Sequence, residues 1–177
     1  MKILSKQKNS RMCMICGLDN EYGVNAPFYN MEDGSVMTVF RYKEQHQSYP
    51  GRVHGGMITA MLDEMGLRSL WAKELSEETF GVTISLDTKY RKPVPYETEL
   101  IGRGVVVKNT SHFIITDSYI MDKEGEILAN GRIKYIKMDT QKIQEGVEVH
   151  EEMPYLVEDG RTEIEGPFFD NLLAAML

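Results

Sequence analysis

The second half of the chain alternates apolar and polar residues in four successive segments. Val82, Ile84 and Leu86, for example, are separated by single polar residues. A period of two is typical of antiparallel strands that bury one face and leave the other exposed. Breaks that contain proline, asparagine or glycine separate the segments. We therefore predict strands over residues 80–92, 97–108, 111–121 and 126–138.

A hairpin and one long helix precede these strands. The hairpin is predicted over residues 26–31 and 35–42, which flank the turn Glu32-Asp-Gly34. Residues 56–75 instead show apolar positions at helical spacing. A sheet this long must bury one face, and this helix is the only long element available to cover it. We therefore predict an α+β fold in which a curved antiparallel sheet, ending in a four-stranded meander, wraps around one long central helix.

Length and charge divide the chain into three parts. At 177 residues it is long enough for one domain with a substantial core. The chain has 27 acidic and 20 basic residues. Nine of the acidic and two of the basic residues lie from residue 141 onward, so residues 1–140 contain 18 of each. We predict an N-terminal segment over residues 1–25, a main domain over 26–140 and an acidic extension over 141–177. Its apolar end, residues 167–177, is expected to dock on the sheet or on a neighbouring subunit.

Composition also excludes several classes of partner. A net charge of −7 argues against nucleic-acid binding, which requires a basic surface. No segment approaches the roughly 18 apolar residues of a membrane span. The basic start of the chain lacks the apolar core of a secretion signal. We therefore expect a cytoplasmic protein that acts on a small molecule and binds neither a membrane nor nucleic acid.

The two cysteines form a Cys13-Met-Ile-Cys16-Gly17 turn near the N-terminus. This spacing is half of a structural zinc site, but the sequence has no second cysteine pair, and the nearest histidine is His46. A redox dithiol requires a helix after the motif, whereas residues 18–24 have the composition of a turn. We therefore expect a packed turn and no metal site, with metal binding and redox chemistry as the alternatives.

Two adjacent carboxylates in the predicted helix face different directions. Asp63 shares its helical stripe with small and apolar residues, namely Gly56, Ala60, Leu67 and Leu70. Glu64 lies one step around the helix, where Arg68 at i+4 offers a solvated ion pair. A carboxylate that interrupts an apolar stripe requires an explanation. Asp63 is therefore the candidate catalytic group, and Glu64 is predicted to be dispensable for the chemistry.

The start of the same helix, Gly55-Gly56, offers a complementary group. Backbone N–H groups at a helix N-terminus lack partners within the helix and suit a developing oxyanion. Glycine also lets a carbonyl approach the backbone closely. His54, directly before the glycines, either sets the turn or points at the ligand.

One helix cannot bring these two groups to the same atom. Eight steps from Gly55 to Asp63 span about 12 Å at about 1.5 Å per residue. A reacting carbonyl must lie about 3 Å from both the oxyanion donor and the base. Two antiparallel copies of the helix satisfy this distance. We therefore predict a homodimer with shared active sites, and a dimer of dimers is left open.

The motif His54-Gly-Gly-x6-Asp63, after a Pro-Gly loop, resembles the hotdog-fold acyl-CoA thioesterases of the phenylacetate-pathway type. The resemblance extends to Tyr90-Arg-Lys-Pro-Val-Pro95 and to the strand segment of residues 125–132. The Cys-x-x-Cys-Gly turn with Asn20 is similar to the N-terminal stretch of one bacterial branch. Together these matches cover roughly residues 13–138. They imply a hotdog fold and hydrolysis of an acyl-CoA.

The resemblance implies roles for individual residues. Asp63 corresponds to the catalytic carboxylate, acting as general base or nucleophile, and the Gly55 N–H to the group that polarises the thioester carbonyl. Thr83 corresponds to a hydroxyl that positions the water from the opposite subunit. Where many members have an asparagine six residues before the histidine, this chain has Ser48. The neighbouring Gln47 is the candidate replacement for that amide.

The remaining candidates concern binding. Arg91 and Lys92 are expected to meet the CoA phosphates, and Gly56 and Glu64 are grouped with them as substrate-binding residues. His54 is grouped with the catalytic ones. No cofactor is expected, because CoA is part of the substrate. The acyl group is not determined by the sequence.

Three other functions remain open. A hotdog protein that binds acyl-CoA without turnover needs the pocket but not the carboxylate. A hotdog dehydratase or hydratase would use a histidine and an acidic residue, which His54 and Asp63 could supply. A small zinc or redox protein built on Cys13 and Cys16 leaves the helix carboxylate unexplained. The Gly-Gly-x6-Asp spacing favours the thioesterase.

Overall fold

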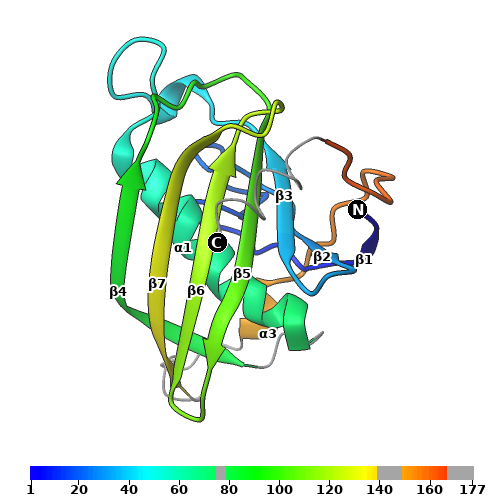
Figure 1. The fold of residues 1–177 in the computed structure, drawn as a ribbon. Coiled ribbons are helices and arrows are strands. Elements are labelled where there is room, and N and C mark those ends of the chain that lie inside the picture. The colour runs from blue at the N-terminus through cyan, green and yellow to red at the C-terminus, as the bar shows by residue number, and fades with distance from the viewer. Residues whose placement is uncertain (75–78, 139–148, 167–177) are drawn as a thin grey trace.

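The computed structural model describes residues 1–74, 79–138 and 149–166. A sheet of seven strands curves around one long helix, α1 (Gly55–Glu74), which lies against its inner face (Figure 1). The strands are β1 (Ile3–Lys6), β2 (Tyr29–Met31), β3 (Val36–Phe40), β4 (Phe80–Tyr90), β5 (Leu100–Asn109), β6 (Phe113–Met121) and β7 (Ile127–Met138). Two short helices, η1 (Glu44–His46) and α3 (Val149–Glu152), complete the described elements. The predicted α+β architecture is confirmed, and only β1 and the short helices were not anticipated.

The order of strands in the sheet differs from the predicted meander. It runs β1-β2-β3-β5-β6-β7-β4, so β4 lies beside β7 and not beside β5. Val82 faces Ile136 and Tyr90 faces Ala129 across this antiparallel pair. The alternation of apolar residues shows that a strand has a covered face, but it does not identify the strand's neighbour. Strand β4 therefore forms one edge of the sheet.

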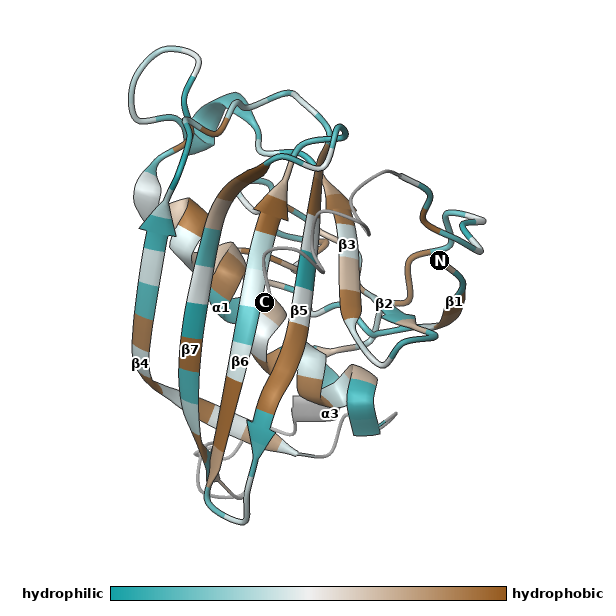
Figure 2. Cartoon of the chain, viewed as in Figure 1, coloured by the Kyte–Doolittle hydropathy of each residue, from teal (hydrophilic) through white to brown (hydrophobic). Residues whose placement is uncertain are grey.

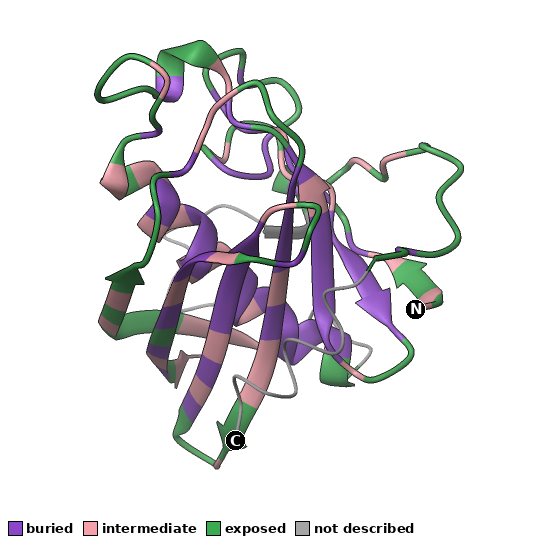
Figure 3. Ribbon diagram, turned by 45° about the horizontal axis from the view of Figure 1, so that its top comes forward, coloured by how far each residue is buried: buried purple, intermediate pink, exposed green. Residues whose placement is uncertain are grey.

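The main core lies between α1 and the inner face of the sheet. Met61, Leu62 and Met65 of α1 are fully buried there. The helix and the sheet approach closely, because a Cβ atom on Gly104 of β5 would lie 2.5 Å from the carbonyl oxygen of Met65. Figure 2 shows the alternating hydropathy along β6 and β7, and Figure 3 shows buried residues in the middle of the sheet and along α1, and mostly exposed residues in the edge strand β4.

A second apolar cluster lies on the outer face of the sheet. Its buried members are Tyr29, Met31, Met37, Ile101, Tyr119, Met121 and Ile164. Most of them alternate along the strands with residues that pack under α1, which places the cluster on the opposite face. Ile164 comes from the acidic extension, which therefore covers part of the sheet.

Backbone and side-chain bonds hold this segment to the N-terminal strand. The N–H of Ile3 donates to Thr162 O at 2.9 Å, and the N–H of Ile164 donates to Met1 O at 2.9 Å. The side chains of Lys6 and Tyr29 both bond to Asp159. The predicted docking of the apolar end concerns residues 167–177, which lie outside the described residues. The described part of the extension, however, packs on the sheet.

Truncation after residue 142 is expected to lower the melting temperature by at least about 3 °C and to leave turnover nearly intact. Burial of Ile164 alone contributes roughly 1.5–3 kcal/mol, and each kcal/mol shifts Tm by about 2–4 °C in a chain of this size. Thermal melts followed by circular dichroism measure the loss. A truncated chain that keeps its Tm but loses turnover would assign the extension to the active site.

Candidate active site

Asp63 lies on the flank of α1 that faces the edge strand β4. The Thr83 hydroxyl on β4 lies 2.9 Å from Oδ1 and 3.1 Å from Oδ2 of Asp63, so its single proton can bond either oxygen. The resemblance implies that the Thr83 hydroxyl positions the attacking water in an active site whose catalytic carboxylate belongs to the other subunit. In the structure the hydroxyl bonds Asp63 of its own chain. Asp63 and Thr83 therefore belong to the same half of any shared site.

The stripe that contains Asp63 is not the most buried face of the helix. Gly56 is exposed, Ala60, Asp63 and Leu67 are half-buried, and only Leu70 at the far end of the stripe is fully buried. The deepest contacts are made instead by the row that contains Ile58, Met61, Leu62 and Met65. Asp63 is thus partly shielded by protein and still open toward the edge of the sheet, which a group that must meet a substrate requires.

Burial raises the pKa of Asp63 above its ordinary value, because the ionised form is poorly hydrated there. The hydrogen bond from Thr83 acts in the opposite direction, and the neighbouring charge of Glu64 adds to the rise. A carboxylate with a raised pKa is a stronger base once it is ionised. The protein environment therefore favours Asp63 as a proton acceptor.

The N-terminus of α1 presents one unused backbone donor. The N–H of Gly56 donates to Nδ1 of His54 at 2.9 Å, and the N–H groups of Met57 and Ile58 donate to the His54 carbonyl. Within residues 1–74, 79–138 and 149–166, no acceptor bonds the N–H of Gly55. This donor is therefore free for a ligand oxygen, which an oxyanion contact requires.

Tyr90, at the end of β4, supports this helix start. Its hydroxyl donates to Gly55 O at 3.1 Å and lies 2.7 Å from Oγ1 of Thr59. A Cβ atom on Gly55 would meet the Tyr90 hydroxyl oxygen at 3.4 Å, an ordinary contact. Tyr90 opens the Tyr-Arg-Lys-Pro-Val-Pro segment of the family resemblance, but no role was predicted for it. Its place directly before the Arg-Lys-Pro turn is the sequence signal that could have identified it.

A shallow pocket of about 320 Å³ opens beside Gly55. Three of its lining side chains, Arg52, Arg91 and Lys92, carry positive charge. Arg91 donates to Asn130 Oδ1 at 2.6 Å, and Lys92 pairs with Glu126. The predicted phosphate-binding residues thus lie next to the predicted oxyanion donor. Arg91 and Lys92 also line a larger hollow of about 1230 Å³ on the outer face of the sheet.

Gln47 and Glu64 differ in how they relate to this pocket. Gln47 is exposed in the loop before α1, where it forms an isolated bridge with Val53. Val53 is one of the pocket residues, so Gln47 lies close to the helix start. Glu64 instead packs against the Cys13 turn on another flank of α1. That position does not support its predicted contact with substrate.

The predicted solvated pair of Glu64 and Arg68 is wrong in one respect. The pair forms, with Nε of Arg68 2.7 Å from Oε1 of Glu64, but the Arg68 side chain is only 1% exposed. Its other partners include Gln7 Oε1, the Lys8 carbonyl and the rings of Phe28 and Trp71. The N-terminal segment covers this flank of the helix, which the helical pattern by itself did not reveal.

Within the described residues, the edge strand β4 carries apolar side chains that remain exposed. Val82 is 39% exposed, Ile84 49% and Tyr90 56%. In the described part of the chain no strand pairs with the outer edge of β4. An unpaired apolar edge of this kind is a template for pairing with another chain. The edge runs directly past Thr83 and Asp63.

Comparisons with known proteins agree with this architecture. The family model of the thioesterase superfamily matches residues 50–129. Acyl-coenzyme A thioesterase THEM4 of Rattus norvegicus is 24% identical over 140 residues, which cover 78% of this chain and 57% of the relative. The chain thus spans little more than half the length of that relative.

Two solved structures are similar in fold. The crystal structure of a thioesterase superfamily protein superposes with a TM-score of 0.63 at 25% identity, covering 71% of this chain and 63% of that protein. A hypothetical thioesterase of Streptococcus pneumoniae with coenzyme A gives 0.55 at 21% identity, covering 65% of this chain and 87% of that one. These likenesses confirm the predicted hotdog fold and the predicted family resemblance.

Of the helices in the described residues, none is both long and apolar enough to span a bilayer.

Proposed function

We propose that this chain, whose residues 50–129 match the family model of the thioesterase superfamily, hydrolyses an acyl-CoA thioester to the free acid and CoA. The observation that carries the proposal is that one chain holds two groups of residues, each of which supplies only part of an active site. Asp63 and Thr83 supply a positioned carboxylate, and Gly55 supplies an unused backbone donor beside three cationic side chains. Each half lacks what the other has.

The chemistry follows from the two groups. The Gly55 N–H donates a hydrogen bond to the thioester oxygen as negative charge develops on it, which lowers the barrier to attack at the carbonyl carbon. Asp63 either takes a proton from an attacking water or attacks the carbon itself to form an anhydride that water then hydrolyses. In both routes the C–S bond breaks and CoA leaves as a thiol. The reaction requires no cofactor, since water and acyl-CoA are its only reactants.

A homodimer built on β4 would unite the halves. Gly55 abuts Tyr90 at one end of the strand, and Asp63 bonds Thr83 near the other end. Antiparallel pairing of two β4 edges about a two-fold axis between Leu86 and Asp87 places Thr83 of one copy opposite Tyr90 of the other. Gly55 of one copy then lies beside Asp63 of the other. The pairing also covers the exposed Val82 and Ile84.

Charge supports CoA as the carrier of the acyl group. Arg52, Arg91 and Lys92 surround the pocket at Gly55, where they can meet phosphate oxygens. The solved Streptococcus pneumoniae relative contains coenzyme A. A dehydratase that used His54 is less consistent with the geometry, because Nδ1 of His54 is occupied by the Gly56 N–H. A binding protein without turnover would leave Asp63 without a role.

Release of free thiol from a panel of acyl-CoA esters tests the proposal. We expect CoA release from at least one aryl, short-chain or long-chain ester. A non-hydrolysable thioether analogue, titrated calorimetrically, measures binding separately from turnover. Tight binding of the analogue without thiol release from any ester would identify an acyl-CoA-binding protein instead of a hydrolase.

Thr83→Val is expected to shift the acidic limb of kcat/KM to higher pH. Asp63 must be ionised to act, so activity falls as pH drops through its pKa, which already lies above the ordinary value. The Thr83 hydrogen bond lowers that pKa, and its loss therefore moves the limb upward. A pH profile of kcat/KM measures the shift. Thr88→Val, on the same strand, is the matched control and should leave the limb unchanged.

A further inference from the structure

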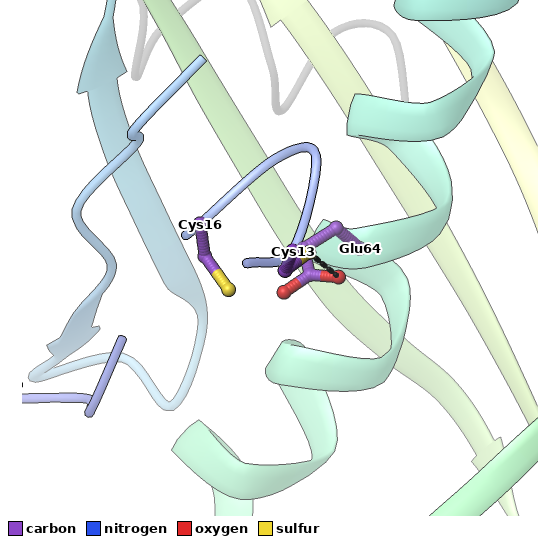
Figure 4. Close-up of side chains that lie close together, drawn as sticks. All are labelled: Cys13, Cys16 and Glu64. Carbon is purple, nitrogen blue, oxygen red and sulfur yellow. Dashed lines mark hydrogen bonds between the residues drawn. The ribbon is translucent and has the colours of Figure 1, made fainter. Parts of the chain in front are cut away.

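Three potential metal ligands from distant parts of the chain meet on the flank of α1 that faces the N-terminal turn. They are the thiols of Cys13 and Cys16 in the N-terminal turn and the carboxylate of Glu64 in α1 (Figure 4). One ligand atom from each lies within 4.8 Å of the other two. Both cysteines are free thiols. The proposed hydrolysis uses none of these groups.

The turn directs backbone donors at the first sulfur. The N–H of Ile15 donates to Cys13 Sγ at 3.4 Å, and the N–H of Gly17 closes the turn on the Cys13 carbonyl at 2.8 Å. Glycine is required at position 17, because a Cβ atom there would lie 2.5 Å from the backbone N and O of Cys13. A turn that is closed in this way and donates N–H groups to sulfur stabilises a thiolate.

The carboxylate is held in place from the other side. Oε1 of Glu64 accepts from Nε of Arg68 at 2.7 Å, while Oε2 lies 3.9 Å from Cys13 Sγ. Arg68 is itself fixed by Gln7 and by the Lys8 carbonyl. One oxygen of Glu64 is therefore committed to Arg68, and the other is left facing the two sulfurs.

We propose that Cys13, Cys16 and Glu64 bind a zinc ion. Thiolate and carboxylate are both ligands of Zn²⁺, with bond lengths of about 2.0–2.3 Å. Such bonds place tetrahedral ligand atoms roughly 3.3–3.8 Å apart, so the present spacing of up to 4.8 Å needs to close by at most about 1.5 Å. A water molecule completes the fourth position, which the partly exposed Cys13 leaves accessible.

Charge favours a divalent cation at this point. Two thiolates and one carboxylate carry three negative charges, which a divalent ion and the buried Arg68 together balance. Binding replaces the two thiol protons, which pass to solvent. Without a cation, the carboxylate opposes ionisation of both thiols. The sequence shows one cysteine pair and no histidine near it, so no metal site was predicted. The fold brings Glu64 to the pair.

The zinc ion would fasten the N-terminal segment to α1 at the residue next to Asp63. Its role is structural, because Glu64 faces the N-terminal turn while Asp63 faces Thr83. The proposal does not depend on the proposed hydrolysis. It can therefore fail or succeed independently of any measurement of turnover.

Cobalt substitution tests the site without an activity assay. The full chain, reduced and freed of metal by a chelator, is titrated with Co²⁺. We expect one equivalent to bind, with a thiolate-to-cobalt charge-transfer band in the near ultraviolet and visible bands of tetrahedral intensity. One equivalent of Zn²⁺ should displace the cobalt and raise the melting temperature of the chain.

Variants test each ligand. Cys13→Ser and Cys16→Ser should each weaken Zn²⁺ binding by more than about 10-fold. Loss of a group that only supports a ligand already costs about 10-fold or more, and these variants remove a ligand itself. Glu64→Gln should weaken it too, and Glu74→Gln, on the same helix, should bind like the wild type. Where Glu64→Gln fails to fold, X-ray absorption of the zinc-loaded wild type reports the ligand set, which we expect to contain two sulfurs and lighter atoms.

Three outcomes would overturn the proposal. The first is the absence of the charge-transfer band in the reduced wild type. The second is a Glu64→Gln variant that folds and binds zinc like the wild type. The third is a reduced pair that binds no zinc but closes to a Cys13–Cys16 disulfide under mild oxidation, which would identify a redox dithiol. The hydrogen bond with Cys16 lowers the pKa of Cys13, which favours the thiolate that disulfide formation requires.

Discussion

Asp63→Asn is expected to lower kcat for acyl-CoA hydrolysis by about 100-fold or more while the chain remains folded. The amide has nearly the same size and can still accept the Thr83 hydrogen bond through its oxygen. The asparagine amide is neither a base nor a nucleophile, so the thioester is no longer attacked by the carboxylate or by a water that the carboxylate activates. KM should change much less than kcat, because the lost interaction is made in the transition state. Thiol-release kinetics and thermal melts measure both effects.

Glu64→Gln is the matched control, since it neutralises the adjacent carboxylate of the same helix. Glu64 pairs with the buried Arg68, so we expect a lower melting temperature and little loss of turnover per folded molecule. If Glu64→Gln removed turnover and Asp63→Asn did not, the roles of the two carboxylates would be reversed. In that case the catalytic group would lie beside the N-terminal turn and not beside β4.

Two inactive variants are expected to restore activity when their subunits exchange. Asp63→Ala removes the carboxylate, and Gly55→Pro removes the unused N–H while keeping a residue that is well tolerated at the first position of a helix. In a mixed dimer, one site carries both defects and the other carries neither. After random exchange of equal amounts, half of the dimers are mixed, so about one quarter of wild-type activity should appear.

Gly55→Ala is the control for the proline variant. It keeps the N–H, and its Cβ would meet the Tyr90 hydroxyl at an ordinary contact distance of 3.4 Å, so turnover should be largely retained. Subunit exchange is verified by mass spectrometry of differently tagged chains. Confirmed mixed dimers without activity would refute the shared site. The base and the oxyanion donor would then have to act within one chain.

Local patterns in the sequence were sufficient for much of the fold. The alternation around Val82 predicted β4, and the helical spacing from residue 56 to 75 predicted α1, which spans Gly55–Glu74. Side-chain periodicity and the positions of glycine and proline depend on neighbouring residues, so one sequence reveals them. The same local spacing separated Asp63 from Glu64 and placed a Gly-Gly start about two turns before Asp63.

Only the tertiary structure decided which segments meet. It placed β4 beside β7, bonded Thr83 to Asp63 of its own chain, and set Tyr90 against Gly55. It also covered Arg68, which the helical pattern had placed in solvent, with the N-terminal segment. Likewise, Glu64 came to the two cysteines through contacts between residues about fifty positions apart. Such contacts depend on packing over the whole chain, and the periodicity of a single segment carries no information about them.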